Sequence, residues 1–181
     1  MAKPKHVLEV FLQPGEYYFG DKQTRMRTIL GSCVSMTFWH PQRLLGGMSH
    51  ILLPLRPESK ARDIDFPLNP SYADEAMDML LLEMKNANTL PREYQVKLFG
   101  GGNMFPNRPI DQRLDIGFKN IAAVRTQLEK HGFISQAEHV GGNGHRYIIF
   151  DVWSGHVWVR HHELGLSSKK SKSQTEPVSE Q

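Results

Sequence analysis

Residues 28–50, TILGSCVSMTFWHPQRLLGGMSH, hold two apolar runs on either side of a short turn signal. The first run, residues 34–39, mixes β-branched and aromatic side chains, and this composition favours a strand. Residues 40–43 have the composition of a turn, and a second apolar run extends from residue 44 to residue 53. We therefore expect a β-hairpin, in which Gly46-Gly47 marks a bulge or a close approach of other atoms to the backbone.

Further strand-like runs lie on both sides of this hairpin. Before its first apolar run are residues 7–12, 17–19 and 28–30, and after the hairpin are residues 96–99, 133–139, 146–151 and 156–160. The last two runs are separated by a tight turn at Ser154-Gly155, so we expect them to form a second hairpin. The chain is therefore expected to be rich in β structure.

Two amphipathic helices are expected among these strands. The apolar stripe of the first helix consists of Ala73, Met77, Leu80, Met84 and Ala87, at steps of three and four residues. The second helix is expected from about residue 115 to residue 131, where Gly132 is well placed to end it. We predict a layered α/β domain of the α+β class, in which both helices cover one face of a mixed, mostly antiparallel β structure.

The length of 181 residues, with 39% hydrophobic and 23% charged residues, fits one folded domain of ordinary size. We expect that domain to span residues 1–165 and to be followed by a disordered tail at residues 166–181. Residues 54–70 contain four prolines and no regular period. This long segment is either a plain surface connection or a lid over a site.

Composition excludes several classes of function. The single cysteine, Cys33, rules out an intramolecular disulfide framework and an all-thiolate zinc site. The formal net charge is +3, and the arginines are scattered among carboxylates, so no nucleic-acid site is expected. No apolar run approaches the roughly 18 residues of a membrane span, and the first ten residues do not resemble a secretory signal. We expect a cytoplasmic protein with no membrane insertion.

The glycine clusters and the histidines do not predict a cofactor. Residues 100–105, GGGNMF, lack the Lys-Ser/Thr pair of a phosphate-binding loop, and residues 141–144 open a strand rather than a helix. The histidines whose spacing best suits a metal site are His156, His161 and His162. Few carboxylates and no cysteine lie near them in the sequence to complete such a site. We interpret them as surface or strand residues, and neither a metal nor another cofactor is expected.

Cys33 and His50 are the candidates for chemistry. Cys33 follows a Gly-Ser pair at which the chain can turn, and the expected hairpin returns His50 to its side. A free thiol has a pKa of roughly 8.5, and an imidazole within hydrogen-bond reach favours a thiolate–imidazolium pair. Thr28 is a candidate to orient the imidazole, through its hydroxyl or its backbone carbonyl. The alternatives are a cysteine that only packs and a core histidine with both nitrogens satisfied.

Five motifs follow one another along the chain. They are LGSCVSM at residues 30–36, GGMSHILLP at 46–54, KLFGGGNMF at 97–105, IG–x–x–N at 116–120 and GGNGHRYIIFD at 141–151. Together and in this order they resemble the CheD family of chemoreceptor glutamine deamidases, and the resemblance covers about residues 7–160. It implies an enzyme, a protein-glutamine glutaminase, that hydrolyses selected glutamine side chains of bacterial chemotaxis receptors to glutamate and releases ammonia.

The same resemblance implies the roles of individual residues. Cys33 falls on the family's nucleophile and His50 on its catalytic histidine. The third catalytic residue of the family is a threonine shortly before the cysteine. Thr28 is the nearest match, and a spacing one residue longer lands on Arg27. The implied reaction passes through a glutamyl thioester, needs no cofactor, and extends in principle to glutamyl methyl esters.

The resemblance also implies a fold and partners. The fold would be like that of toxin-type glutamine deamidases. The substrate would be the helical cytoplasmic region of a chemoreceptor, in a groove framed by residues 54–70 and 100–114, and a CheC-type phosphatase would be a regulatory partner. Two other functions remain open, namely a non-catalytic adaptor that binds receptors or such a phosphatase, and an amidase for small molecules.

Overall fold

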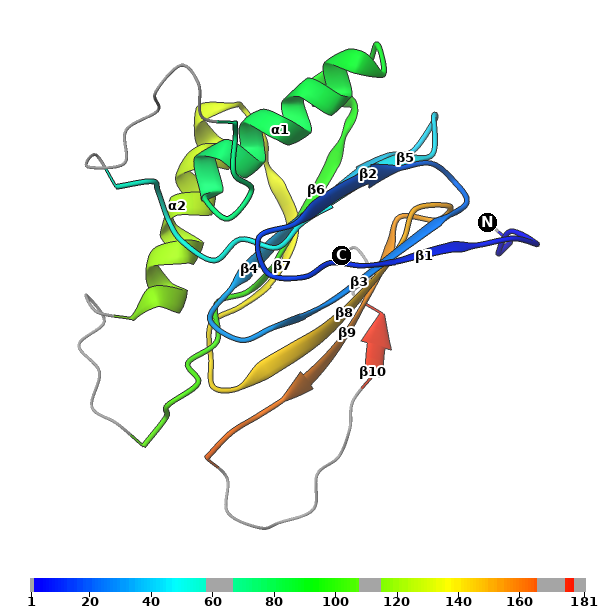
Figure 1. Cartoon of the computed structure of the whole chain (residues 1–181). Helices are drawn as coiled ribbons and strands as arrows, with labels where there is room; N and C mark the ends of the chain where they lie inside the picture. Colours follow the sequence, from blue (N-terminus) through cyan, green and yellow to red (C-terminus); the bar gives the residue numbers. More distant parts are fainter. Residues whose placement is uncertain (1, 58–66, 108–114, 166–174, 178–181) are drawn as a thin grey trace.

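Three layers make up the part of the chain that the computed structural model describes, residues 2–57, 67–107, 115–165 and 175–177. Two helices form the first layer, a five-stranded sheet the second, and another five-stranded sheet the third (Figure 1). We call the middle layer the central sheet and the third layer the outer sheet. The predicted α+β class, with both helices on one face of the β structure, is confirmed.

The central sheet has the strand order β2-β5-β4-β6-β7. These strands are β2 (Tyr17–Gly20), β4 (Val34–His40), β5 (Leu45–Ser49), β6 (Gln95–Gly100) and β7 (Ser135–Val140). β4 and β5 are antiparallel and joined by a turn, which confirms the first predicted hairpin. Among the described strands of this sheet, β7 alone runs parallel to its neighbour, β6.

The outer sheet has the strand order β1-β3-β8-β9-β10. These strands are β1 (Leu8–Phe11), β3 (Thr24–Leu30), β8 (His145–Asp151), β9 (His156–His162) and β10 (Thr175–Pro177). β8 and β9 form the second predicted hairpin, and β1 runs parallel to β3. Six of the eight strand pairs in the described residues are antiparallel, as predicted.

The two α-helices lie where the periodicity predicts them, as α1 (Ala73–Asn86) and α2 (Ile116–Lys130), and a short 3₁₀ helix, η2 (Pro91–Glu93), leads into β6. Asp115 caps α2 by accepting a hydrogen bond from the Gly117 N–H at 2.8 Å. Both α-helices pack against the central sheet. The buried core between them includes Val34, Ile51, Met77, Leu80 and Val124. Among the described residues, neither helix combines the length and the apolar character that crossing a membrane requires.

A second core fills the space between the two sheets. Its buried members include Leu30, Met48, Phe99, Ile148 and Phe150. The sheets approach each other closely at Gly46, where an added Cβ would lie 2.9 Å from the Phe150 ring, so the predicted close approach at Gly46-Gly47 is confirmed. Burial alternates strictly along β3, because one face of this strand meets the second core and the other face points away from it.

Parts of three predicted segments lie outside the described residues. These parts are residues 58–66 of the candidate lid, residues 108–114 of the candidate groove wall, and residues 166–174 and 178–181 of the predicted tail. Within the predicted tail, Thr175–Pro177 forms β10 and pairs with β9.

Candidate active site

The β4–β5 hairpin continues past its named strands and brings Cys33 and His50 to the same place. Val34 and Ile51 exchange two backbone hydrogen bonds, of 3.0 and 2.8 Å, in an antiparallel bridge. Their side chains face the helices. Because side chains alternate along a strand, Cys33 and His50 face the outer sheet instead, as diagonal neighbours about 7 Å apart in their backbones.

His50 is held in one orientation by a chain of two hydrogen bonds. The ring is 2% exposed, and its Nδ1 lies 2.7 Å from the Thr28 hydroxyl oxygen. That hydroxyl donates its single proton to the Leu12 carbonyl oxygen at 2.8 Å. The hydroxyl must therefore accept from His50, so the neutral ring carries its proton on Nδ1. His50 Nε2 is left with a bare lone pair, and it is buried without a hydrogen-bond partner among the described residues.

The structure distinguishes between Thr28 and Arg27, the two candidates for the third catalytic residue. Thr28 points into the space between the sheets and is 1% exposed. Arg27 points out of the opposite face of β3, where it lies 3.5 Å from Glu9. Only the Thr28 side chain meets the His50 ring, through its hydroxyl rather than its backbone carbonyl.

Burial shifts the pKa values of Cys33 and His50 in the directions that favour the neutral forms. Desolvation raises the pKa of the half-buried Cys33 thiol above its ordinary value. Desolvation also lowers the pKa of the His50 imidazole. No hydrogen bond between the sulfur and Nε2 is formed in this structure. Both pKa shifts disfavour the expected thiolate–imidazolium pair, since a low-dielectric site penalises both charges, and they favour a neutral thiol and a neutral imidazole.

Backbone hydrogen bonds from the glycine motif at the end of β6 hold the turn that carries Cys33. The Gly101 N–H donates to the Cys33 carbonyl oxygen at 2.7 Å, and the Gly102 N–H donates to the Gly31 carbonyl oxygen at 2.8 Å. Gly100 has a φ of +107°, and an added Cβ there would overlap the Cys33 carbonyl oxygen. The GGGN motif therefore shapes the cysteine turn by close backbone approach instead of cradling a phosphate.

Asn120 ties α2 to the same turn. It is fully buried, and its Nδ2 donates to the Ser32 carbonyl oxygen at 3.1 Å and to the Leu52 carbonyl oxygen at 2.9 Å. A Cβ at Gly117 would lie 2.7 Å from the Gly101 carbonyl oxygen, which explains the glycine of the IG–x–x–N motif. Sequence reasoning found this motif but assigned no role to Asn120; the three-residue spacing of glycine and asparagine at the start of a helix was the signal.

Arg146 is a second residue whose role sequence reasoning missed. It is 1% exposed; its Nε donates to His139 Nδ1 at 2.7 Å and its Nη2 donates to the Gly141 carbonyl oxygen. Its Nη1 is buried with no hydrogen-bond partner among the described residues, and burial lowers the pKa of the guanidinium. An added Cβ at Gly102 would lie 3.1 Å from Nη1, so the arginine sits behind the loop that holds Cys33.

The three histidines at the end of the chain's last hairpin lie apart from this site. His161 Nε2 lies 2.8 Å from the Asn143 carbonyl oxygen, and the His162 ring stacks on His145 at 5.1 Å. His156 is exposed and contacts Trp158. No group of three or more histidine, cysteine or acidic side chains with metal-binding geometry occurs within the described ranges.

Comparison with known proteins identifies the relatives of this chain. Residues 52–161 match the family described as CheD chemotactic sensory transduction. The chain is 44% identical to "Probable chemoreceptor glutamine deamidase CheD" of Pseudomonas syringae pv. tomato, over 95% of this chain and 100% of that protein. It is 47% identical to the protein of the same name from Pseudomonas fluorescens, over 92% of each. Among solved structures it is similar to hypothetical protein YfiH of Bacillus licheniformis, at 15% identity and a TM-score of 0.43, covering 67% of this chain and 49% of that chain.

Proposed function

The chain belongs to the CheD family, and from this premise we propose that it hydrolyses glutamine side chains of chemoreceptors to glutamate and releases ammonia. Its enzyme class is that of its relatives, the protein-glutamine amide hydrolases. The proposed nucleophile is the Cys33 thiol, the proposed general base and acid is His50, and Thr28 is the residue that positions the base.

One observation carries this proposal. His50 has its Nδ1–H engaged by Thr28 at 2.7 Å, its Nε2 is buried without a hydrogen-bond partner among the described residues, and the strand register puts the residue on the same face as Cys33. An imidazole in a core that only packs has no reason to keep one nitrogen buried and unpartnered, because an unsatisfied buried polar atom costs about 1–3 kcal/mol. A bare base beside a thiol is the arrangement that nucleophilic catalysis requires.

The first step begins from the neutral pair. The Cys33 sulfur attacks the carboxamide carbon of the glutamine while the thiol proton passes to His50 Nε2, so that the charges form only as the S–C bond forms. The carbonyl electrons move onto oxygen, which becomes an oxyanion. The backbone N–H groups of Ser32 and Cys33 are the proposed donors to this oxyanion, since neither donates to a backbone carbonyl within the described part of the chain.

The second half of the reaction returns the site to its starting state. The His50 imidazolium gives its proton to the departing nitrogen, the C–N bond breaks, and ammonia leaves a glutamyl thioester on Cys33. A water molecule then attacks the thioester while Nε2 takes one of its protons. The C–S bond breaks, the sulfur regains a proton from the imidazolium, and glutamate is released.

Exposed apolar side chains beside the Cys33 turn favour a protein substrate. Leu53 and Leu55 are exposed just beyond Leu52, and Phe105 is exposed just beyond Met104, which lies over Gly31. Exposed apolar side chains in the segments that flank the Cys33 turn suit the surface of a helix better than a small, fully polar molecule. The helical cytoplasmic region of a chemoreceptor, a CheC-type phosphatase as regulatory partner, and hydrolysis of glutamyl methyl esters remain predictions from the family resemblance.

Mass spectrometry of a receptor fragment tests the proposal. Incubation with the protein is expected to raise the mass by about one dalton at particular glutamines, because an amide becomes an acid through the activated thiol. Cys33→Ala and His50→Ala are expected to abolish the gain, whereas His145→Ala, in the outer sheet, keeps it. Unchanged masses with retained receptor binding would identify an adaptor, and ammonia release from free glutamine would identify a small-molecule amidase.

A further inference from the structure

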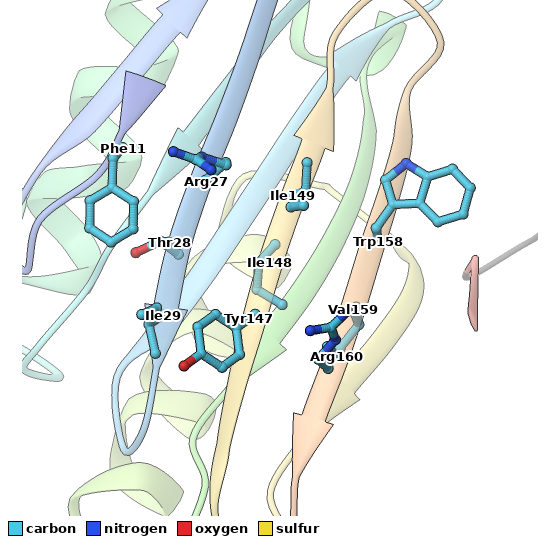
Figure 2. A pocket seen from close by; sticks show the side chains of 10 residues that line it. All are labelled: Phe11, Arg27, Thr28, Ile29, Tyr147, Ile148, Ile149, Trp158, Val159 and Arg160. Carbon is cyan, nitrogen blue, oxygen red and sulfur yellow. The ribbon is translucent and has the colours of Figure 1, made fainter. Parts of the chain in front are cut away.

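The face of the outer sheet that points away from the central sheet carries apolar side chains where polar ones are expected. An antiparallel sheet with one solvated face normally alternates between apolar residues inside and polar residues outside. Here the alternation is kept, but outward positions hold Phe11, Ile29, Tyr147 and Trp158, from four neighbouring strands (Figure 2). Phe11, Ile29 and Tyr147 are each at least 40% exposed. A contiguous apolar patch of this kind marks an interaction surface.

This face is hollowed rather than flat. The side chains enclose a groove with a cavity volume of about 290 Å³. The four strands that line it are separated by three gaps of about 4.8 Å each, so the groove is about 14 Å across. An α-helix is about 10 Å wide with its side chains, and such a groove admits one apolar stripe of a helix.

The charges at the margin of the groove are positive. Arg27 and Arg160 line it on β3 and β9. Arg27 shares Glu9 with Arg25, at 3.5 and 3.8 Å, and Arg25 is also paired with Asp151 at 2.6 Å. Arg160 makes no ion pair with any described residue, so three outward arginines face two carboxylates. The complementary partner therefore carries acidic side chains beside its apolar stripe.

We propose that this groove is the docking site for an amphipathic helix of a partner protein, whose apolar stripe fills the groove and whose flanking carboxylates meet Arg27 and Arg160. The proposal does not rest on the deamidase activity. Thr28 borders the groove, but its side chain is buried and its hydroxyl meets His50 on the inner side of β3, so a docked helix on the outer face leaves the Cys33 side of the molecule free for substrate. It also contacts Phe11, whose next residue, Leu12, accepts the Thr28 hydrogen bond.

Two synthetic helical peptides of about 18 residues test the proposal, long enough to form a helix on binding. Both carry the same leucine stripe; one has glutamates and the other lysines beside it. Nuclear magnetic resonance of the whole protein would locate and titrate the binding. The glutamate peptide is expected to bind one to one, with shifts at Ile29, Tyr147 and Trp158, and about tenfold or more tightly than the lysine peptide.

Variants with matched controls make the outcome decisive. Arg160→Glu and Tyr147→Ser are each expected to weaken binding of the glutamate peptide about tenfold. Arg92→Glu, an exposed arginine on η2, and Leu82→Ser, an exposed leucine on α1, are expected to leave it unchanged. Circular dichroism checks that each variant is folded. Equal binding of both peptides, binding insensitive to Arg160→Glu, or a dimer of this chain that Tyr147→Ser dissociates would each overturn the proposal.

Discussion

The two faces of the outer sheet carry opposite kinds of side chain, although the same strands supply both. Toward the central sheet, Thr28 and Arg146 are polar and almost fully buried. On the other face, their sequence neighbours Ile29 and Tyr147 are apolar and exposed. The inner face therefore departs from the usual rule by burying polar side chains, and the outer face departs from it by exposing apolar side chains. Buried polar groups are costly and are kept where they do chemistry, whereas exposed apolar groups are kept where another molecule covers them.

Replacing His50, the proposed base on the inner face, is expected to give the largest effect on activity. His50→Ala is expected to lower kcat/KM for receptor glutamines about 10³-fold, because general acid–base catalysis by a positioned side chain contributes an effect of that order. The loss is measured by the rate of the one-dalton mass gain in a receptor fragment. His145→Ala on the outer face, which removes a ring stacked on His162 at 5.1 Å, is expected to change the rate less than about twofold. Equal losses in both variants would contradict the assignment of the base.

The hydroxyl that positions the base gives the next largest effect. Thr28→Val keeps the shape of the side chain but removes the acceptor for His50 Nδ1–H, so the ring can turn and carry its proton on Nε2. We expect kcat to fall about 10- to 100-fold, as for other residues that orient a functional group. Thr28→Ser is expected to restore most of the rate, because it keeps the hydroxyl.

The control for this prediction is the adjacent residue. Ile29→Val alters the same strand on its outer face and is expected to leave kcat unchanged. Rescue by Thr28→Ser separates positioning from packing, since serine lacks the methyl group that packs. If Thr28→Ser is as slow as Thr28→Val, the hydroxyl is not the positioning group.

Local sequence patterns account for the pairing of Cys33 with His50 and for both helices. The turn at residues 40–43 fixes the register of the hairpin, and the register makes Cys33 and His50 diagonal neighbours on one face. The stripe of Met77, Leu80 and Met84 likewise needs only helical periodicity. These features depend on residues close together in the chain, so the sequence alone could predict them.

Long-range contacts account for what could not be predicted. The Leu12 carbonyl oxygen reaches Thr28 because β1 pairs in parallel with β3, and no local pattern encodes that pairing. The raised pKa of Cys33 follows from burial, which acts on the thiol only after the layers have assembled. Arg146 is buried against expectation, because arginine is usually a surface residue; its partners His139 and Gly141 are close in sequence, but the packing of the two sheets is what buries it.

Two arginines, one on each face of the outer sheet, are expected to differ in how much they contribute to the free energy of unfolding. Arg146→Lys cannot keep the bonds to both His139 and Gly141, so at least one buried acceptor loses its partner. We expect the free energy of unfolding, measured by urea denaturation, to fall by about 2 kcal/mol. Arg160→Lys on the outer face, which has no ion pair in the described residues, is expected to change it by about 0.5 kcal/mol or less.

The pH dependence of Cys33 alkylation tests whether the inner face keeps its groups neutral. Because burial raises the pKa of the thiol, iodoacetamide is expected to react more slowly at pH 7 than with free cysteine. The rate then rises with pH beyond the range in which free cysteine levels off. Because burial lowers the pKa of His50, kcat/KM is expected to fall on the acid side only below about pH 6.5.

His50→Ala is the control for the alkylation experiment. In a neutral pair the ring does not stabilise the thiolate of the free protein, so the alkylation rate of the variant stays close to that of the unmodified chain. Fast labelling near pH 6 that slows in His50→Ala would instead indicate a thiolate–imidazolium pair in the resting protein, and the base would then act only after attack.

The smallest expected effect belongs to the apolar side chains of the outer face. Tyr147→Ser is expected to change the free energy of unfolding by about 0.5 kcal/mol or less, because the residue is 42% exposed and the ring's aromatic contacts among the described residues are with His145 and His162 of the same sheet. Ile148→Val, one residue further along β8 and fully buried, is expected to cost about 1 kcal/mol although it removes a single methylene. If the tyrosine ring contributes less to the free energy of unfolding than one buried methylene, the fold does not account for the ring, and docking does. If Tyr147→Ser instead costs as much as a core substitution, the outer face is part of the folding core and the docking site loses its main support.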